Sequence, residues 1–119
     1  MADHNEFGKQ GEQMAADYLI KKNYILLEKN FRYRKAEIDL IAKKDNEVII
    51  VEVKARSNDY YGNPQDFINQ KKIELLVEAA NHYVIKNDLD VEVRFDIISI
   101  LQKNGKIHLK HLENAFLHF

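Results

Sequence analysis

Apolar and polar residues follow one another along the chain with two different periods. Apolar side chains recur every three or four residues between Phe7 and Leu19, and again between Ile68 and Val84. This spacing predicts an amphipathic helix in each segment. The other apolar segments are short and rich in β-branched residues, as in strands. The expected elements are a helix over residues 6–22, strands over 24–33, 36–44 and 47–55, a helix over 68–84, and strands over 91–101 and 106–110.

The order of these elements, α-β-β-β-α-β-β, predicts an α/β protein with a mixed central β-sheet flanked by helices. A length of 119 residues suits one domain. The composition, 45% hydrophobic and 31% charged, is that of a globular chain. The sequence has no cysteine, which excludes a disulfide framework and a thiolate metal site.

Neither a secretory signal nor a membrane span is expected. Residues 1–13 lack the apolar core of a signal peptide, and no apolar run approaches the ~18 residues of a membrane helix. We therefore expect a soluble, cytoplasmic protein. The net charge is only −1, so any binding to nucleic acid would depend on a local basic surface.

Two neighbouring apolar strands carry charged residues near their ends. Asp45-Asn46 is a plausible two-residue turn between them. In that register Asp39 faces Glu52, and Glu37 faces Lys54. Opposed residues share a face, so these four charges are expected to cluster at one end of the sheet. The reverse face of the hairpin is expected to be wholly apolar, with Ile38, Leu40, Ile49, Val51 and Val53.

The predicted juxtaposition of Asp39 and Glu52 needs a physical explanation. Directly opposed Cβ atoms lie ~5 Å apart, and two carboxylates at about that distance repel by roughly 3 kcal/mol at an effective dielectric near 20. Protonation of one carboxyl or a shared divalent cation removes this repulsion. Mg²⁺ takes oxygen ligands and is commonly held by one or two carboxylates. The alternative is an ordinary solvated sheet end with cross-strand salt bridges.

These residues also carry a resemblance to known proteins. Asp39, followed on the next strand by Glu52-Val53-Lys54, resembles the PD-(D/E)XK nuclease motif. The segments KQGEQMAADYL, AEIDLIA, IIVEVKAR and VRFDII resemble the YraN-like family of small uncharacterised proteins, which is related to archaeal Holliday-junction resolvases. The similarity extends from Gly8 to Phe116. It implies a restriction-endonuclease-like fold and a single nuclease-like domain over residues 1–119.

The resemblance further implies roles for individual residues. Asp39, Glu52 and the backbone carbonyl of Val53 would bind Mg²⁺ or Mn²⁺, and Lys54 would be the motif lysine. Nearby carboxylates favour the ammonium form of Lys54, so we expect it to act through its charge. Glu12 would match an early glutamate of the resolvases. Glu37 would either pair with Lys54 or bind the metal, and both alternatives stay open.

The activity implied by the resemblance is metal-dependent endonucleolytic hydrolysis of DNA, with branched or damaged DNA as the expected substrate. Cleavage of a junction needs two sites, and hence a homodimer. Two other hypotheses remain: a nucleic-acid-binding module of nuclease fold that does not cleave efficiently, and a protein-interaction domain with surface acids.

A basic segment precedes the acidic strand. KNFRYRK contains Lys29, Arg32, Arg34 and Lys35, which are expected to contact phosphates. Its aromatic residues would either stack on unpaired bases or, as we expect, pack inward. Arg56 and the loop over residues 60–63 are expected to form the opposite wall. Lys72 falls on the apolar face of the second helix, so we expect its amine to reach the site or the solvent. Each histidine is expected to be at the surface or partly packed.

Overall fold

A computed structural model describes residues 2–57 and 68–116 of the chain. The predicted wall over residues 60–63 lies outside the described residues. The elements are α1 (Ala2–Lys21), β1 (Ile25–Tyr33), β2 (Ala36–Lys44), β3 (Glu47–Ser57), α2 (Gln70–Lys86), β4 (Glu92–Lys103) and β5 (Lys106–Leu112). The predicted order is therefore confirmed, with element ends that differ from the prediction by a few residues.

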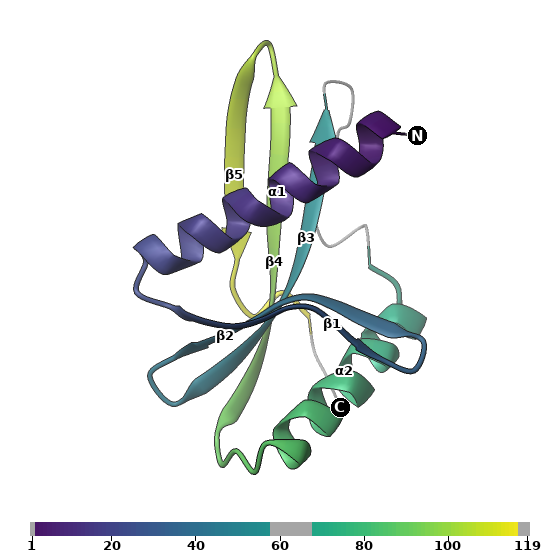
Figure 1. Ribbon diagram of the computed structural model, residues 1–119, viewed down its shortest axis with the longest axis vertical. Helices are drawn as coiled ribbons and strands as arrows, with labels where there is room; N and C mark the ends of the chain where they lie inside the picture. Colours follow the sequence, from purple (N-terminus) through teal and green to yellow (C-terminus); the bar gives the residue numbers. More distant parts are fainter. Residues whose placement is uncertain (1, 58–67, 117–119) are drawn as a thin grey trace.

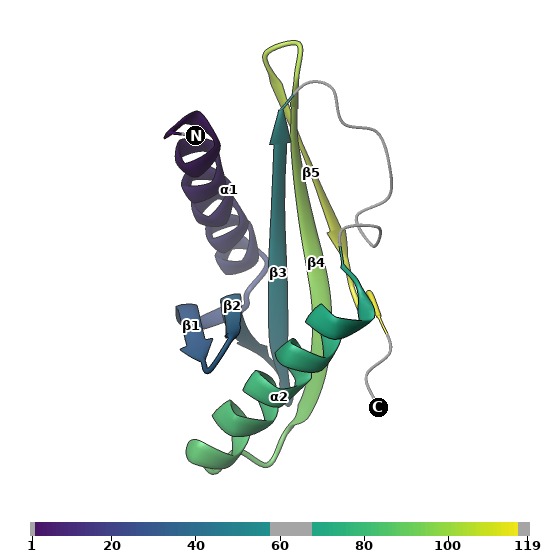
Figure 2. The ribbon, with the colours of Figure 1, turned by 90° about the vertical axis from the view of Figure 1, so that its right-hand side faces the viewer.

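The five strands form one mixed sheet in the order β1-β2-β3-β4-β5. Only the β3–β4 pair is parallel, and the other described pairs are antiparallel. A parallel pair needs a crossover connection, and α2 lies in the one between β3 and β4. The helices cover opposite faces of the sheet, because alternate residues of β3 pack beneath α1 and beneath α2, and the first half of β3 is buried on both sides. Figure 2 shows α1 to the left of β3 and α2 crossing the lower part of the strands.

Each helix closes one hydrophobic core. Beneath α1 the core consists of Ala15, Ala16, Leu19, Tyr24, Leu40, Ala42, Ile49, Val51, Ile98 and Ile100. Beneath α2 it consists of Ala36, Ile38, Ile41, Val48, Ile50, Leu76, Ala79, Ala80, Tyr83 and Phe95. The two helical stripes of the sequence supply the α1 and α2 residues of these cores. Figure 1 shows β1 and β2 running across the longer strands, as in a strongly twisted sheet.

The register predicted for the β2–β3 hairpin is confirmed from Lys44–Glu47 to Leu40–Val51. The face predicted for Ile38 is wrong, because Ile38 packs beneath α2 whereas Leu40 packs beneath α1. On the neighbouring strand β1, Asn30 has a left-handed φ of 54°. The β1–β2 ribbon thus turns over near Asp39, which simple alternation of faces does not anticipate.

Helix α1 crosses β3 at very short range. A Cβ added at Gly11 would lie 2.7 Å from Cβ of Ala55, whereas one added at Gly8 would meet nothing within 4 Å. Gly11 therefore permits the close approach of helix and strand. This contact also holds the next residue, Glu12, at the sheet end.

A buried polar network ties α1 to β4 and β5. Asp96 has 0% exposure and accepts hydrogen bonds from Nε and Nη2 of Arg94, both at 2.9 Å, and from the backbone N–H of Asn114 at 3.0 Å. His111 Nε2 lies 2.7 Å from Asp96 Oδ2, and the other ring nitrogen lies 3.0 Å from the Tyr18 hydroxyl. The His111 side chain is only 6% exposed, so it is buried more deeply than we expected. The segment Arg94-Phe95-Asp96 thus holds α1, β4 and β5 together through this network.

Among the described helices, none combines the length and the apolar character that crossing a bilayer requires.

Candidate functional site

The site begins where β2 separates from β3. Backbone pairing of the two strands ends at Leu40–Val51. Beyond it, Oδ2 of Asp39 accepts a hydrogen bond of 2.8 Å from the backbone N–H of Val53. The carboxyl of Asp39 thus takes the place of a backbone acceptor at the point where the strands diverge. Asp39 and Glu52 are not paired through the backbone, which differs from the predicted register.

The carboxyl groups of Asp39 and Glu52 nevertheless meet. Glu52 is only 3% exposed. Burial, followed by the charge of Glu52 and a hydrogen bond with it, raises the pKa of Asp39 to about 8, although the Val53 N–H acts in the opposite direction. Burial is the largest cause of this shift, and the repulsion between the two carboxyl groups that was inferred from the sequence adds to it.

Lys72 is placed against this pair by the start of α2. The side chain of Asn69 caps the helix by accepting a hydrogen bond of 2.9 Å from the backbone N–H of Lys72. The ammonium of Lys72 forms an ion pair with Oε2 of Glu52. Burial lowers the pKa of Lys72, but the hydrogen bond and the charge of Glu52 outweigh burial, so the pKa is raised. Of the two positions expected for this amine, the site or the solvent, the structure has it at the acidic pair, and a functional role for it stays a prediction.

Lys54 lies beside the same carboxylate, but the direction of its pKa differs from our expectation. Burial, and then the charge of Lys72, lowers the pKa of Lys54, and the opposing effect of Glu52 is too small to reverse this. Burial of the amine, the larger cause, and the charge of Lys72 together explain the difference, because the sequence indicates neither how deeply Lys54 is buried nor how close the two ammonium groups lie.

Glu12 reaches the site and Glu37 lies at its edge. Burial and the charge of Glu37 raise the pKa of Glu12, although a hydrogen bond with Asn30 opposes the shift. Glu37 does not pair with Lys54 as its predicted cross-strand position suggested. It forms a salt bridge of 3.0 Å with Arg32 on β1, because β2 turns toward β1 at this end of the sheet.

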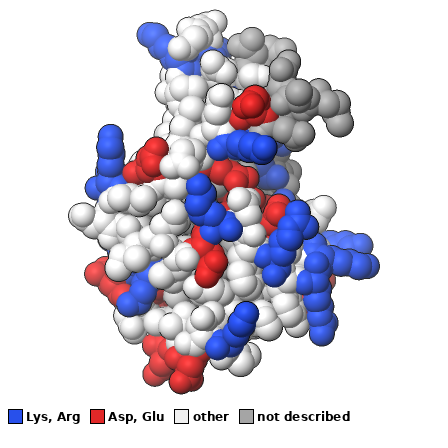
Figure 3. Space-filling view, viewed as in Figure 1, with Lys and Arg blue, Asp and Glu red and all other residues white. Residues whose placement is uncertain are grey.

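These side chains line one cavity of about 400 Å³. It is bounded by Gly8, Glu12, Lys35, Glu37, Asp39, Glu52, Val53, Lys54, Ala55, Arg56 and Lys72. Four acids and four basic residues are present in this set. Such a balance suits a ligand that combines a cation with an anion better than either ion alone. Figure 3 shows acidic side chains near the centre of one face with basic side chains on several sides of them.

The predicted phosphate contacts divide into two groups. Lys35, Arg56 and Lys72 line the cavity. Lys29, Arg32 and Arg34 do not line it. Lys29 donates a hydrogen bond of 2.9 Å to Gln13, and Arg34 lies 5.2 Å from the centroid of the Tyr33 ring. Nucleic-acid contact by these residues stays a prediction.

The aromatic residues of the basic segment pack inward, as we expected. The Phe31 ring centroid lies 5.2 Å from that of Tyr83, and the Tyr33 ring stacks at 4.0 Å on His82. Both residues contribute to the core beneath α2. Their rings are therefore engaged by α2.

The donor set fits a hard divalent cation. Oε2 of Glu52 is buried and, apart from the ammonium of Lys72, meets no donor among the described residues. The adjacent Asp39 carboxyl supplies further oxygen ligands of the kind that Mg²⁺ prefers. In the described part of the chain, no three acidic or histidine side chains are arranged to hold a metal. A cation bound here would therefore be held by two carboxylates, and a role for the Val53 carbonyl stays a prediction.

The arrangement is that of a restriction-endonuclease-like α/β fold. The ends of β2 and β3 diverge, each strand carries an acid there, and a lysine follows two positions after Glu52. Residues 11–100 match the profile of "Uncharacterised protein family UPF0102". The chain belongs to this family, which is the YraN-like group of the nuclease superfamily.

The relatives are similar over their whole lengths. The chain is 53% identical over 119 residues to a UPF0102 protein of Christiangramia forsetii, and 52% identical over 119 residues to one of Flavobacterium psychrophilum, with 100% of both chains covered in each case. It is 42% identical over 116 residues to a UPF0102 protein of Bacteroides thetaiotaomicron, which covers 98% of this chain and 96% of the relative.

Proposed function

We propose that this protein is a Mg²⁺-dependent endonuclease that hydrolyses phosphodiester bonds in DNA, with Mn²⁺ as a substitute metal. The observation that carries the proposal is the meeting of the Asp39 and Glu52 carboxyls beside the amines of Lys54 and Lys72, in one cavity. Two carboxyl groups in one poorly solvated place favour a cation between them, and lysines next to that cation favour an anionic ligand such as phosphate.

In this proposal each side chain has a distinct task. Asp39 and Glu52 hold the metal, with the Val53 carbonyl as a further ligand. The chemistry supplied by bound Mg²⁺ is a lowered pKa of water and neutralisation of charge on the phosphoryl oxygens. Lys54 places a cation where negative charge develops in the transition state. Glu12, which faces the acids from α1, orients the attacking water through a hydrogen bond.

Lys72 neutralises the carboxylate of Glu52 before metal and DNA bind. Its ammonium is paired with Oε2 of Glu52, an oxygen that Glu52 would also use to hold a metal. The side chain is 38% exposed and long, so the amine is able to turn from the carboxylate toward a phosphate without movement of α2. Lys35 and Arg56, from two other walls of the cavity, then position the flanking backbone.

The test is cleavage of linear, single-stranded, flap and four-way DNA with Mg²⁺ or Mn²⁺. Asp39→Asn and Glu52→Gln are each expected to reduce the cleavage rate by at least about 100-fold, because removal of one catalytic interaction costs on the order of 10²–10³. Asp45→Asn is the matched control. Asp45 is exposed in the β2–β3 turn with a φ of 54°, a conformation that Asn tolerates, and its rate should stay within about twofold of wild type. If both site variants cut like the wild type, the proposal is wrong.

The ion pair between Lys72 and Glu52 favours a second candidate, a nucleic-acid-binding module of the same fold that does not cleave efficiently. An internal ammonium already neutralises Glu52, so the cavity is able to bind phosphate without a metal. A wild-type protein that binds DNA equally well in EDTA and in Mg²⁺, and cuts none of the four substrates, would favour this candidate.

A further inference from the structure

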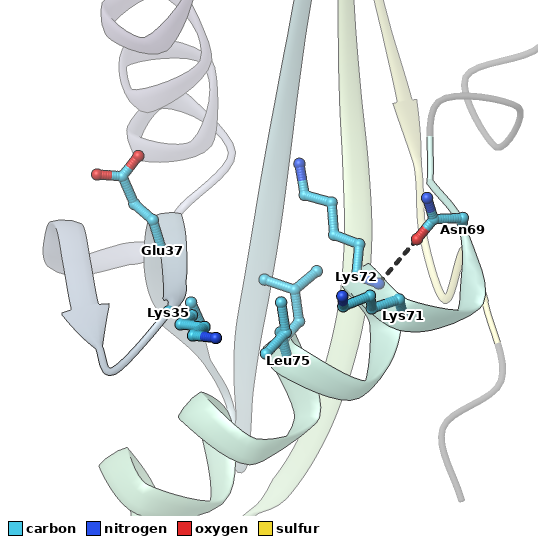
Figure 4. A pocket seen from close by; sticks show the side chains of 8 residues that line it. Lys35, Glu37, Asn69, Lys71, Lys72 and Leu75 are labelled. Atoms are coloured by element: carbon cyan, nitrogen blue, oxygen red, sulfur yellow. Dashed lines mark hydrogen bonds between the residues drawn. The ribbon is translucent and has the colours of Figure 1, made fainter.

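A second cavity adjoins the acidic one. It has a volume of about 230 Å³ and lies between the start of β2 and the first turns of α2. Lys35, Glu37 and Lys72 line both cavities, so the two are direct neighbours that share a wall. Figure 4 shows Leu75 at the centre of the second cavity, with Lys35 on the β2 side and Lys71 and Lys72 on the α2 side.

The second cavity differs from the first in its chemistry. Its floor is apolar and consists of Ala36, Leu75 and Leu76, of which the first and last are only 4% and 2% exposed. Its rim carries three lysines and one acid, Glu37, whose charge is offset by Arg32. A flat heterocycle with apolar faces and a neighbouring phosphate has the complementary distribution of apolar surface and charge. A volume of this size is below the roughly 300–1,000 Å³ of pockets for drug-sized ligands, and suits a single base.

We propose that this cavity binds one unstacked nucleobase of the strand whose phosphate lies in the acidic cavity. The inference rests on the proposed function and narrows its substrate class. A base inside a duplex is stacked and paired, and unstacking it costs a few kcal/mol. The site therefore selects DNA in which the nucleotide next to the bound phosphate is already unpaired, as in a single strand, a flap or the branch point of a junction.

The position of the two cavities supports this substrate class. They share walls, so a base and its own phosphate are able to occupy both at once. Lys71 is exposed at the outer rim, where the next phosphate of an extended strand would pass. The aromatic residues that often stack on bases are packed into the core at Phe31 and Tyr33, so here the apolar contact with a base comes from aliphatic side chains.

The test measures the affinity for a short single-stranded oligonucleotide in which one abasic site is moved along the sequence. Fluorescence anisotropy is recorded with Ca²⁺, a hard cation that binds carboxylate and phosphate oxygens, and gels verify that the DNA stays intact. In the wild type, an abasic site at one position, and at its immediate neighbours only, is expected to weaken binding by about tenfold. That factor corresponds to burial of roughly 55 Å² of apolar base surface.

Variants assign this loss to the cavity. Leu75→Gln places an amide in the floor, and Leu75→Phe fills the space, so either should abolish the tenfold difference between intact and abasic DNA. Ile73→Gln is the matched control, because Ile73 is similarly half-buried on α2 but lines a groove on another side of the helix. Its abasic penalty should equal that of the wild type. Thermal melts of all three variants verify folding, and the Phe variant keeps the test decisive if the Gln variant unfolds.

The outcomes separate this inference from the proposed function. If wild type binds and cuts DNA but no abasic position weakens binding, or if Leu75→Phe retains the full penalty, the base site is refuted while the nuclease proposal stands. If wild type neither binds nor cuts any DNA, both fall. Equal affinity for a continuous duplex and a single strand would also refute the base site alone.

Discussion

The repulsion between Asp39 and Glu52 makes a quantitative prediction for the metal-free protein. The raised pKa of Asp39, about 8 against an ordinary 3.8, means that the folded state holds a proton that the unfolded chain releases. Between pH 4 and pH 8 the folded state therefore binds more protons, and its stability falls as pH rises through this window. Asp39→Asn removes the ionisable group and should abolish this loss.

The size of the effect follows from the shift. A displacement of about four pKa units corresponds to a ceiling of roughly 6 kcal/mol at 1.36 kcal/mol per unit. We expect about 2–4 kcal/mol at pH 8, because Glu52 shares the proton and the cavity admits water. For a chain of this length that gain raises the Tm by about 10 °C. The asparagine side chain retains an oxygen for the Val53 N–H, so the hydrogen bond at the strand junction survives.

The assay is thermal unfolding in EDTA from pH 4 to pH 8, for wild type, Asp39→Asn and Glu37→Gln. The difference between Asp39→Asn and wild type should be near zero at pH 4 and grow steadily to pH 8. Glu37→Gln is the control, since Glu37 lies on the same strand but is half-exposed and paired with Arg32. With Mg²⁺ added, only a protein that keeps both carboxyls should gain stability. The reasoning would be refuted if Asp39→Asn had a lower Tm than wild type at pH 8. It would also be refuted if the difference in Tm between the two proteins did not change with pH.

Three further predictions concern the elements around the site. Gly11→Ala should lower the stability by about 1–3 kcal/mol because its Cβ overpacks the helix against β3, whereas Gly8→Ala should be neutral or stabilising by up to ~1 kcal/mol, as measured by urea unfolding. Lys72→Met should destabilise the metal-free protein by about 1–2 kcal/mol because the buried oxygen of Glu52 loses its partner, and the exposed Lys71→Met should have no effect in the same melts. Asp96→Asn should cost about 3–5 kcal/mol near neutral pH. Hydrogen bonds outweigh burial and hold the pKa of Asp96 below 3.8. The contribution of Asp96 to stability is therefore present above pH ~4 and is lost as pH falls further. An acid titration in which the variant loses the same stability as the wild type would contradict this.

Much of the architecture could be predicted from local patterns. Helical periodicity located α2 and its buried face. The Asp45-Asn46 turn fixed the register of β2 and β3, because a two-residue turn determines which residues of the two strands lie opposite each other. The same register brought Asp39 close to Glu52. The position of Lys72 on an apolar helix face was itself a signal, since a lysine there must reach a polar partner or solvent.

The remaining details depend on contacts between distant segments. The turn of the ribbon at Asn30 places Ile38 in the core beneath α2 and brings Glu37 to Arg32. A single left-handed residue inside a strand leaves no periodic pattern in the sequence from which the turn could be predicted. The lowered pKa of Lys54 depends first on burial and then on Lys72, a neighbour in space but not in sequence. Likewise, the partners of Asp96 come from the C-terminal segment, at His111 and Asn114, as well as from its own strand. Such convergence is set by tertiary packing.

The parallel pairing of β3 with β4 also has a consequence for synthesis of the chain. Glu47 pairs with Glu92 and Ser57 with Gln102, so each contact spans 45 residues. An emerging polypeptide therefore exposes an unpaired, strongly apolar β3 edge until β4 has left the ribosome, and non-local pairing of this kind forms slowly. We expect truncated nascent chains ending before β4 to need chaperones, and the burial of the acidic pair to be completed only after β4 has emerged.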